Sequence, residues 1–198
     1  MAKIGWGRIL AGVATVAAAG AAYVYYKQRT SKAPIYEVAL IDGAFEIRSY
    51  PALSVLETDQ AGSRDRALGI GFGRLAGYMF GEGREGDELP ITMPVLAATL
   101  GEGAWRVRFL LPDGESGDSL QTPGEGLAIG ILPAREVAVV SVPGKPTDRL
   151  FRSRSGDLQR WLKDKGRVAA GPAEHAYYTS PLDLGAQQAS EIWVPLAR

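Results

Sequence analysis

Two stretches of this chain carry the same landmarks in the same order, and this internal repeat constrains the fold more than any other feature. Tyr50-Pro51-Ala52 in the first stretch corresponds to Leu132-Pro133-Ala134 in the second. Thr92-Met93-Pro94 likewise corresponds to Thr179-Ser180-Pro181. The two motifs of the first pair are separated by nearly the same number of residues as those of the second pair. We therefore interpret most of the chain as two halves of similar length and similar structure.

Each half has the local pattern of a strand, a helix and two further strands. Runs rich in β-branched residues, VLET at 55–58 and EVAVVSV at 136–142, are typical of strands. A leading segment, residues 35–50, adds strands with a hairpin at Asp42-Gly43. The sequence therefore predicts an α+β fold of two pseudo-symmetric strand–helix–strand–strand repeats, in which an antiparallel sheet curls and carries two helices.

The two helices are predicted from apolar residues at helical spacing. The second can begin at Thr147 or Asp148, which are capping residues, and can end at Gly166. The predicted apolar faces are Leu68, Phe72, Leu75, Ala76 and Met79 on the first helix, and Leu150, Phe151, Leu158, Trp161 and Leu162 on the second.

The first helix contains a glycine-rich run, GIGFGRLAGYMFG at 69–81. It is not a nucleotide-binding loop, because Arg74 stands where the dinucleotide fingerprint needs its third glycine and no lysine follows as in a Walker loop. Each helical glycine costs about 1 kcal/mol relative to alanine. Two explanations remain open: close packing of the helix on the sheet, or a shallow groove in which a flat ligand meets the backbone.

Residues 1–33 are predicted to be a membrane anchor and a linker, and residues 34–198 a single domain. Eighteen residues from Ile9 to Tyr26 carry no charge, which is close to the shortest helix that spans a bilayer. Trp6 and Tyr23 lie near the two ends, as interfacial aromatic residues do. A cleaved signal peptide is the alternative, since small residues precede Tyr23. We expect a single-pass protein of the bacterial inner membrane with its domain on the periplasmic side.

Composition limits the chemistry of the domain. Cysteine is absent and His175 is the single histidine, so thiolate and multi-histidine sites are excluded. The 22 basic residues balance 22 acidic ones, but residues 1–33 are basic and contain no acid, which leaves the domain acidic. An acidic domain argues against nucleic acid as a partner. No nucleophile paired with a base is visible, and we therefore expect no enzyme.

Six short motifs follow one another along residues 35–197. They are Tyr36-Glu37-Val38, FEIR at 45–48 with Tyr50-Pro51, FGRLAGYMFG at 72–81, ITMPV at 91–95, WRVRFLLP at 105–112 and EIWVP at 191–195. Together they resemble the SOUL/haem-binding protein family. This resemblance implies that the two repeats form a distorted antiparallel β-barrel with two flanking helices, here preceded by the predicted transmembrane helix. It also implies non-catalytic binding of haem or a related tetrapyrrole.

The resemblance also suggests where a tetrapyrrole would lie. In the family the ligand is thought to rest on the first helix, which here presents Leu68, Phe72, Leu75 and Met79. Arg66 and Arg74 are nearby cations of a kind that pairs with propionates. Family members are proposed to use an axial histidine near the start of this helix, where the present chain has none. His175, expected in a loop before a strand, is the remaining imidazole, with Met79 and the tyrosines at 78, 177 and 178 as alternatives.

Three functions stay open at this point. The first is a membrane-anchored binding or carrier protein for haem or another tetrapyrrole. The second is a binding module for other flat apolar ligands, similar to drug-sensing domains. The third is an interaction subunit of a larger membrane complex, in which the anchor docks and the pocket is vestigial.

Overall fold

The computed structural model describes residues 33–179 and 189–197. Within these residues nine strands form one antiparallel sheet, in the order β1-β2-β7-β9-β8-β4-β5-β3-β6. The leading hairpin is β1 (Glu37–Asp42) and β2 (Phe45–Tyr50), and Gly43 makes its turn with a φ of +60°. The predicted hairpin is thus confirmed.

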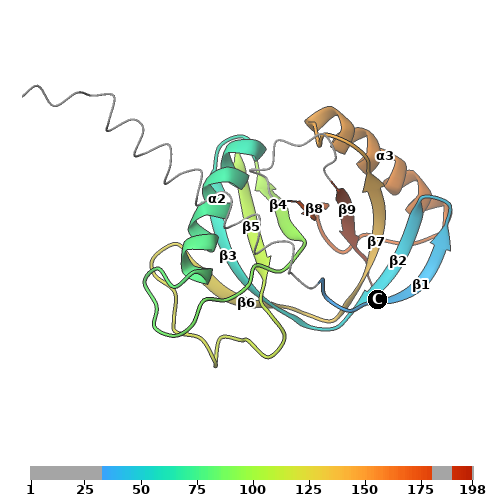
Figure 1. Ribbon diagram of the computed structural model, residues 1–198. Coiled ribbons are helices and arrows are strands. Elements are labelled where there is room, and N and C mark those ends of the chain that lie inside the picture. The colour runs from blue at the N-terminus through green and yellow to red at the C-terminus, as the bar shows by residue number, and fades with distance from the viewer. Residues whose placement is uncertain (1–32, 180–188, 198) are drawn as a thin grey trace, which may run out of the picture.

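Both predicted repeats are present. The first consists of β3 (Leu53–Ala61), α2 (Arg64–Met79), β4 (Val95–Gly101) and β5 (Ala104–Leu110). The second consists of β7 (Arg135–Val142), α3 (Asp148–Asp164), β8 (Glu174–Tyr177) and β9 (Ser190–Pro195), and β6 (Ala128–Leu132) precedes it. The repeats meet where β4 pairs with β8. Figure 1 shows them as two halves of one sheet, each with its helix.

The strand that leads into each repeat pairs with the other repeat. β2 continues into β3 but pairs with β7, whereas β6 continues into β7 but pairs with β3. Pro51 and Pro133 stand at the two turns between these strands, which explains why the sequence repeats there. The exchange ties the halves together at both ends of the sheet.

The expected barrel is corrected in one respect: in the described residues the sheet does not close. β1 pairs only with β2 and β6 only with β3, so these strands are the two edges of a curled half-barrel. Neither described segment, 33–179 or 189–197, contains a helix long and apolar enough to cross a bilayer. The predicted membrane segment, residues 9–26, lies outside the described residues.

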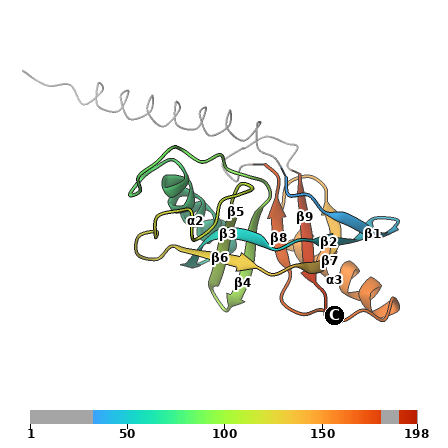
Figure 2. The ribbon, with the colours of Figure 1, turned by 90° about the horizontal axis from the view of Figure 1, so that it is seen from below.

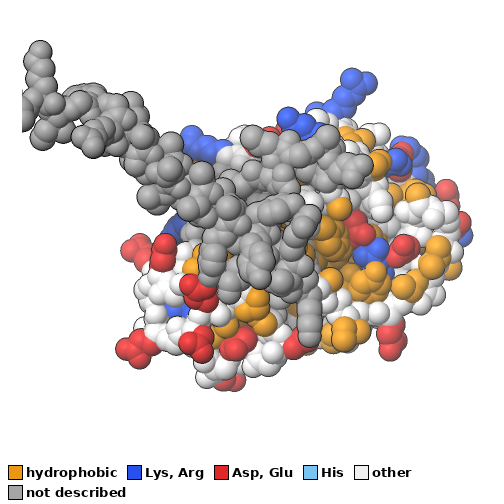
Figure 3. All heavy atoms as spheres, viewed as in Figure 1, with side chains coloured by type: hydrophobic (Ala, Val, Ile, Leu, Met, Phe, Trp, Pro, Cys, Tyr) orange, Lys and Arg blue, Asp and Glu red, His pale blue; other side chains and the backbone are white. Residues whose placement is uncertain are grey.

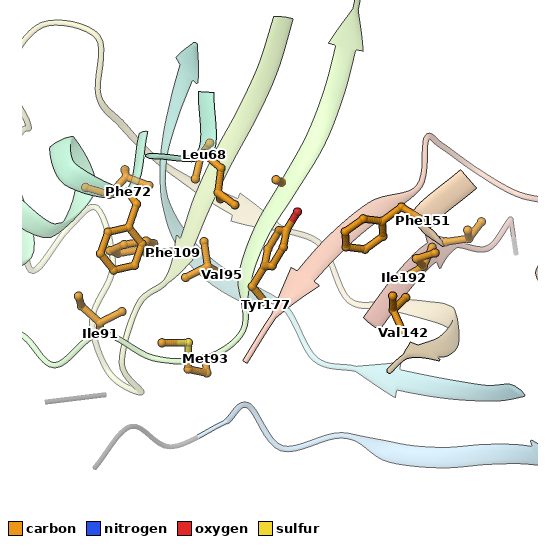
Figure 4. Packing of buried hydrophobic residues seen from close by; sticks show 14 of the residues in the cluster. Leu68, Phe72, Ile91, Met93, Val95, Phe109, Val142, Phe151, Tyr177 and Ile192 are labelled. Carbon is orange, nitrogen blue, oxygen red and sulfur yellow. The ribbon is translucent and has the colours of Figure 1, made fainter. Parts of the chain in front are cut away.

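The helices cover one face of the sheet. α2 packs on β3 and β5, and α3 packs mainly on β7 (Figure 2). Thr147 caps α3, its hydroxyl accepting a hydrogen bond from the Leu150 amide at 3.3 Å, and Gly166 follows the helix with a φ of +66°. One continuous core joins the two helices, from Phe72 through Tyr177 to Phe151 (Figure 4).

Close packing on the sheet explains one glycine of the first helix, Gly71. A Cβ at this position would lie 2.7 Å from Cγ2 and 2.9 Å from Cβ of Val107 on β5. A Cβ at Gly69 or Gly73 would meet nothing within 4 Å. Close packing on the sheet therefore accounts for Gly71, while Gly69 and Gly73 are on the solvent side of α2.

A second apolar cluster lies on the opposite face of the sheet. The curl brings Tyr50 of β2 onto Trp193 of β9, with ring centroids 4.7 Å apart. Leu96 and Trp193 are completely buried there although, within the described residues, both helices pack on the other face. The curl itself therefore provides a second interior.

Candidate functional site

The apolar side chains predicted to hold a ligand on α2 lie in the core. Leu68 is 5% exposed, and Phe72, Leu75 and Met79 are at most 1% exposed. Phe72 packs edge-on against Phe109 of β5, with centroids 5.1 Å apart. A ligand could reach this face only if α2 moved away from the sheet. That these residues bind a ligand stays a prediction.

The two arginines predicted to pair with propionates lie on the outside of α2. Arg66 is exposed and its aliphatic part lies beside Gly62. Arg74 is exposed and donates a hydrogen bond to the Glu125 carbonyl. Neither guanidinium adjoins the apolar face of the helix, so the structure does not bring the two halves of the predicted site together.

His175 lies in β8 and not in a loop, which corrects the sequence prediction. Its ring stacks on Phe151 of α3, with centroids 4.0 Å apart and planes 2° apart, and Trp105 packs nearby. Burial, assisted by the Arg64 charge, lowers the pKa of His175 to about 4. The imidazole is therefore neutral at physiological pH, the form in which it can bind a metal.

A buried polar cluster surrounds Phe151 between the first turns of α2 and α3. Arg64 is 5% exposed, lies over the Phe151 ring at 4.8 Å and forms an ion pair with Asp148 at 3.0 Å. His175 Nδ1 and the Tyr177 hydroxyl are buried there without a hydrogen-bond partner among the described residues. Figure 4 shows the Tyr177 hydroxyl directed toward the space between Leu68 and Phe151. The cluster joins the two helices.

A cavity lies on the opposite face of the sheet, and we call it the aromatic pocket. It has a volume of about 360 Å³. Three tyrosines, an arginine and a glutamate form most of its wall, and small residues at 33, 34 and 189 complete it. The five larger residues are Tyr36, Arg48, Tyr50, Tyr178 and Glu191.

An ion pair between distant strands forms one side of this pocket. Arg48 Nη1 and Nη2 each donate to a carboxylate oxygen of Glu191 at 2.9 Å, and Arg48 Nε donates to Glu46 at 2.7 Å. Tyr178 and Trp193 also donate to Glu191, at 2.7 and 2.8 Å. Four donated bonds fix this carboxylate, as buried charge requires.

Two tyrosines of the pocket, Tyr50 and Tyr178, stay protonated. Burial raises the pKa of Tyr50 to about 12. Burial and the neighbouring Glu191 charge raise the pKa of Tyr178 above its usual range. The pocket therefore presents neutral rings and hydroxyls around one paired arginine, a surface that suits stacking of a flat ligand.

A second cavity of about 300 Å³ adjoins the aromatic pocket, and both are lined by Ala33 and Pro34. Leu53, Leu111 and Thr92 are among its other lining residues. Pockets for small molecules occupy about 300–1,000 Å³. Together the two cavities fall within that range. Figure 3 shows hydrophobic, basic and acidic side chains side by side over the region of β2 and β7.

Sequence reasoning did not identify Arg48, Tyr50 or Glu191 as site residues, and it named Tyr178 only as an alternative axial ligand. Arg48 and Glu191 are separated by 143 positions in the chain, so no local pattern joins them. One signal was available: a charged residue within an apolar strand, as in FEIRSY and SEIWVP, requires a buried partner.

The sheet with two helices is shared with solved structures of low sequence identity. The EcmrR C-terminal domain is 15% identical with a TM-score of 0.59, over 83% of this chain and 99% of that one. A hydrolase from Listeria innocua is 12% identical with a TM-score of 0.58, over 80% and 94% of the chains. An uncharacterized conserved protein from Listeria innocua is 11% identical with a TM-score of 0.59, over 77% and 92%. At these identities the likeness shows the fold alone.

Family membership rests on the sequence match. Among curated proteins none matches the chain as a relative. A family model described as SOUL heme-binding protein matches residues 31–195, which include both repeats and every strand of the sheet. The resemblance inferred from six motifs is thereby confirmed, and it supports haem as a ligand. The chain belongs to the SOUL haem-binding protein family.

Proposed function

We propose that the domain binds haem or a related tetrapyrrole without catalysing a reaction on it, in the aromatic pocket and the cavity beside it. The observation that carries this proposal is a cavity walled by Tyr36, Tyr50 and Tyr178, on the face of the sheet opposite the two described helices. The apolar face of α2 is a weaker candidate, because the helix would have to leave the sheet.

The residues of the pocket fit a tetrapyrrole in part. The aromatic walls and apolar cavity suit a flat macrocycle. Arg48 is the cation of the pocket wall, and its guanidinium already binds Glu46 and Glu191. A ligand carboxylate would reach Arg48 most easily by displacing Glu46, whose side chain is 32% exposed against 14% for Glu191. His175 lies on the other face of the sheet, so iron ligation in this pocket would not involve it.

Haemin titration of matched variants tests the proposal. Tyr36→Ala removes a wall of the aromatic pocket at a residue that is 37% exposed, so the fold should persist. We expect this variant to weaken saturable haemin binding by about tenfold, the loss of one stacking contact worth about 1 kcal/mol or more. Arg66→Ala and Arg74→Ala, on the outside of α2, should leave the affinity unchanged. Two results would overturn the proposal. One is a loss of haemin affinity in the arginine variants but not in Tyr36→Ala, and the other is a non-saturating absorption change in the parent protein.

A second candidate function is binding of flat lipophilic cations. It is favoured by the charges at the pocket, where the carboxylates Glu46 and Glu191 outnumber the single guanidinium of Arg48. Aromatic rings also attract cations. Displacement of a cationic rhodamine dye by haemin would show a shared pocket, and a dye that binds more tightly than haemin would favour this second function.

We further propose that residues 9–26 anchor the domain to the bacterial inner membrane, with the domain in the periplasm. The uncharged run and its aromatic ends support this. Flotation of the full chain with lipid vesicles tests the anchor, and activity of alkaline phosphatase fused after residue 198 tests the side. If a larger complex co-purified with the full chain but not after deletion of residues 1–33, the anchor would also be a docking element.

A further inference from the structure

The edge strand β1 exposes apolar side chains where edge strands usually carry charge. Ile35 just before it is 82% exposed, and Val38 and Ile41 are 48% and 66% exposed. Natural sheet edges are protected by charged residues or proline, because an exposed apolar edge associates with other surfaces. Among the large apolar residues of the other edge strand, β6, only Ile131 is comparably exposed. The β1 edge, where three such residues gather, is therefore a candidate contact surface.

This apolar edge lies beside the aromatic pocket. Val38 pairs with Arg48, and Ile41 pairs with Glu46, so both project on the face where Arg48 lines the pocket. Tyr36, two residues before Val38, lines the cavity, and its ring centroid is 4.6 Å from the Arg48 guanidinium carbon. The exposed apolar side chains thus form a rim on the β1 side of the pocket.

The sequence before β1 indicates which partner covers this rim. The uncharged run ends at Tyr26, and residues 27–34 can span at most about 30 Å. This linker carries Lys27, Arg29 and Lys32, which favour anionic headgroups. Ala33 and Pro34, directly after it, line both cavities. A domain held so closely by an anchor would keep β1 near the membrane surface.

We propose that the β1 edge, with Ile35, Val38 and Ile41, rests in the interfacial layer of the membrane, so that the aromatic pocket opens to the bilayer and receives its ligand from the lipid. The inference rests on the proposed anchor. Tyr36 at the rim has the amphipathic character of residues that favour this layer. An apolar ligand dissolved in the bilayer would then enter the pocket without crossing water.

Single cysteines in the full chain test the orientation, because the natural sequence contains none. Ile35→Cys and Ile41→Cys report on β1, and Ile131→Cys, at the other edge and 70% exposed, is the matched control. Each variant carries a polarity-sensitive fluorophore in vesicles of phosphatidylcholine and phosphatidylglycerol. A fraction of the lipids bears a nitroxide near the headgroup. We expect a several-fold loss of fluorescence at positions 35 and 41 and little loss at 131.

The results of this experiment distinguish a failure of the proposed orientation of β1 from a failure of the proposed membrane anchor. A chain that fails to float with vesicles overturns both. A chain that floats, with labels at 35 and 41 quenched no more than at 131, overturns the orientation alone. Disulfide-linked dimers through Ile41→Cys would show that a second copy covers β1, and would also overturn it.

A transfer measurement tests the route of the ligand. Ile41→Glu places a charge in the rim, and Ile131→Glu places the same charge at the control edge. With haemin preloaded in the vesicles, we expect uptake about tenfold slower for Ile41→Glu than for the parent, the effect of about 1.4 kcal/mol on the barrier. Ile131→Glu should match the parent, and haemin added in detergent should bind all three alike. Equal uptake from vesicles by the two glutamate variants would contradict the route.

Discussion

Arg48 of β2 and Glu191 of β9 form a bidentate ion pair, with both N–O distances 2.9 Å, across the strand β7 that separates them in the sheet. Arg48 is 6% exposed. The pair fixes one wall of the aromatic pocket. Its removal should therefore affect both the stability and the ligand site.

Arg48→Met should lower the free energy of unfolding by about 3–5 kcal/mol, because it leaves the Glu191 carboxylate buried without a cation. Arg106→Met is the control, since its partner Asp59 is half exposed and such pairs contribute about 1 kcal/mol or less. Urea denaturation measures both. Equal losses for the two variants would show that Arg48 and Glu191 are not an energetically distinct pair.

Gly71→Ala should destabilise the protein by about 1–3 kcal/mol, because the new methyl group overlaps Val107 and overpacking costs more than the helix gains. Gly73→Ala faces open space and should stabilise it by about 0.5–1 kcal/mol. Thermal unfolding of the two variants gives the comparison. If haemin affinity fell with Gly73→Ala while stability rose, a ligand would lie on the exterior of α2 after all.

Stability should fall as the pH is lowered from about 6.5 to about 4. The pKa of His175 is lowered to about 4 by burial and by Arg64, so within this window the unfolded chain binds a proton that the folded protein does not. The loss should reach about 3 kcal/mol at its low end. His175→Gln should flatten the profile in urea denaturation. The pKa values of Asp42 and Asp59 are also lowered from 3.8. Protonation of these two carboxylates therefore reduces stability only below that pH, outside the window.

Arg64→Gln should raise the pKa of His175 without restoring it to 6.5, because burial is the larger cause of the shift and the Arg64 charge the smaller. The single histidine gives one imidazole signal for titration by NMR. Asp157→Asn, which removes a charge on α3 at a side chain that is 31% exposed, is the control. An unchanged pKa in Arg64→Gln would mean that Arg64 does not act on the imidazole.

The local features of the fold were readable from the sequence. The helix faces built on Phe72 and Phe151, the cap at Thr147 and the hairpin at Gly43 all depend on neighbours within a few positions. The repeat gave the order of elements for the same reason, since corresponding turns need corresponding residues. Even the glycines of α2 could be assigned to a helix from periodicity alone.

The site depended on the tertiary structure. Strand exchange between the repeats brings Arg48 to Glu191, and the curl places Tyr50 on Trp193; neither follows from spacing along the chain. His175 looked like a loop residue because its strand is only four residues long, and its surroundings come from α2 and α3. The sequence by itself determined which residues are helical and which face of each helix is apolar, because these follow from local periodicity. The tertiary structure decided which residues share a cavity, because strand order and curl are set by burial across the whole sheet.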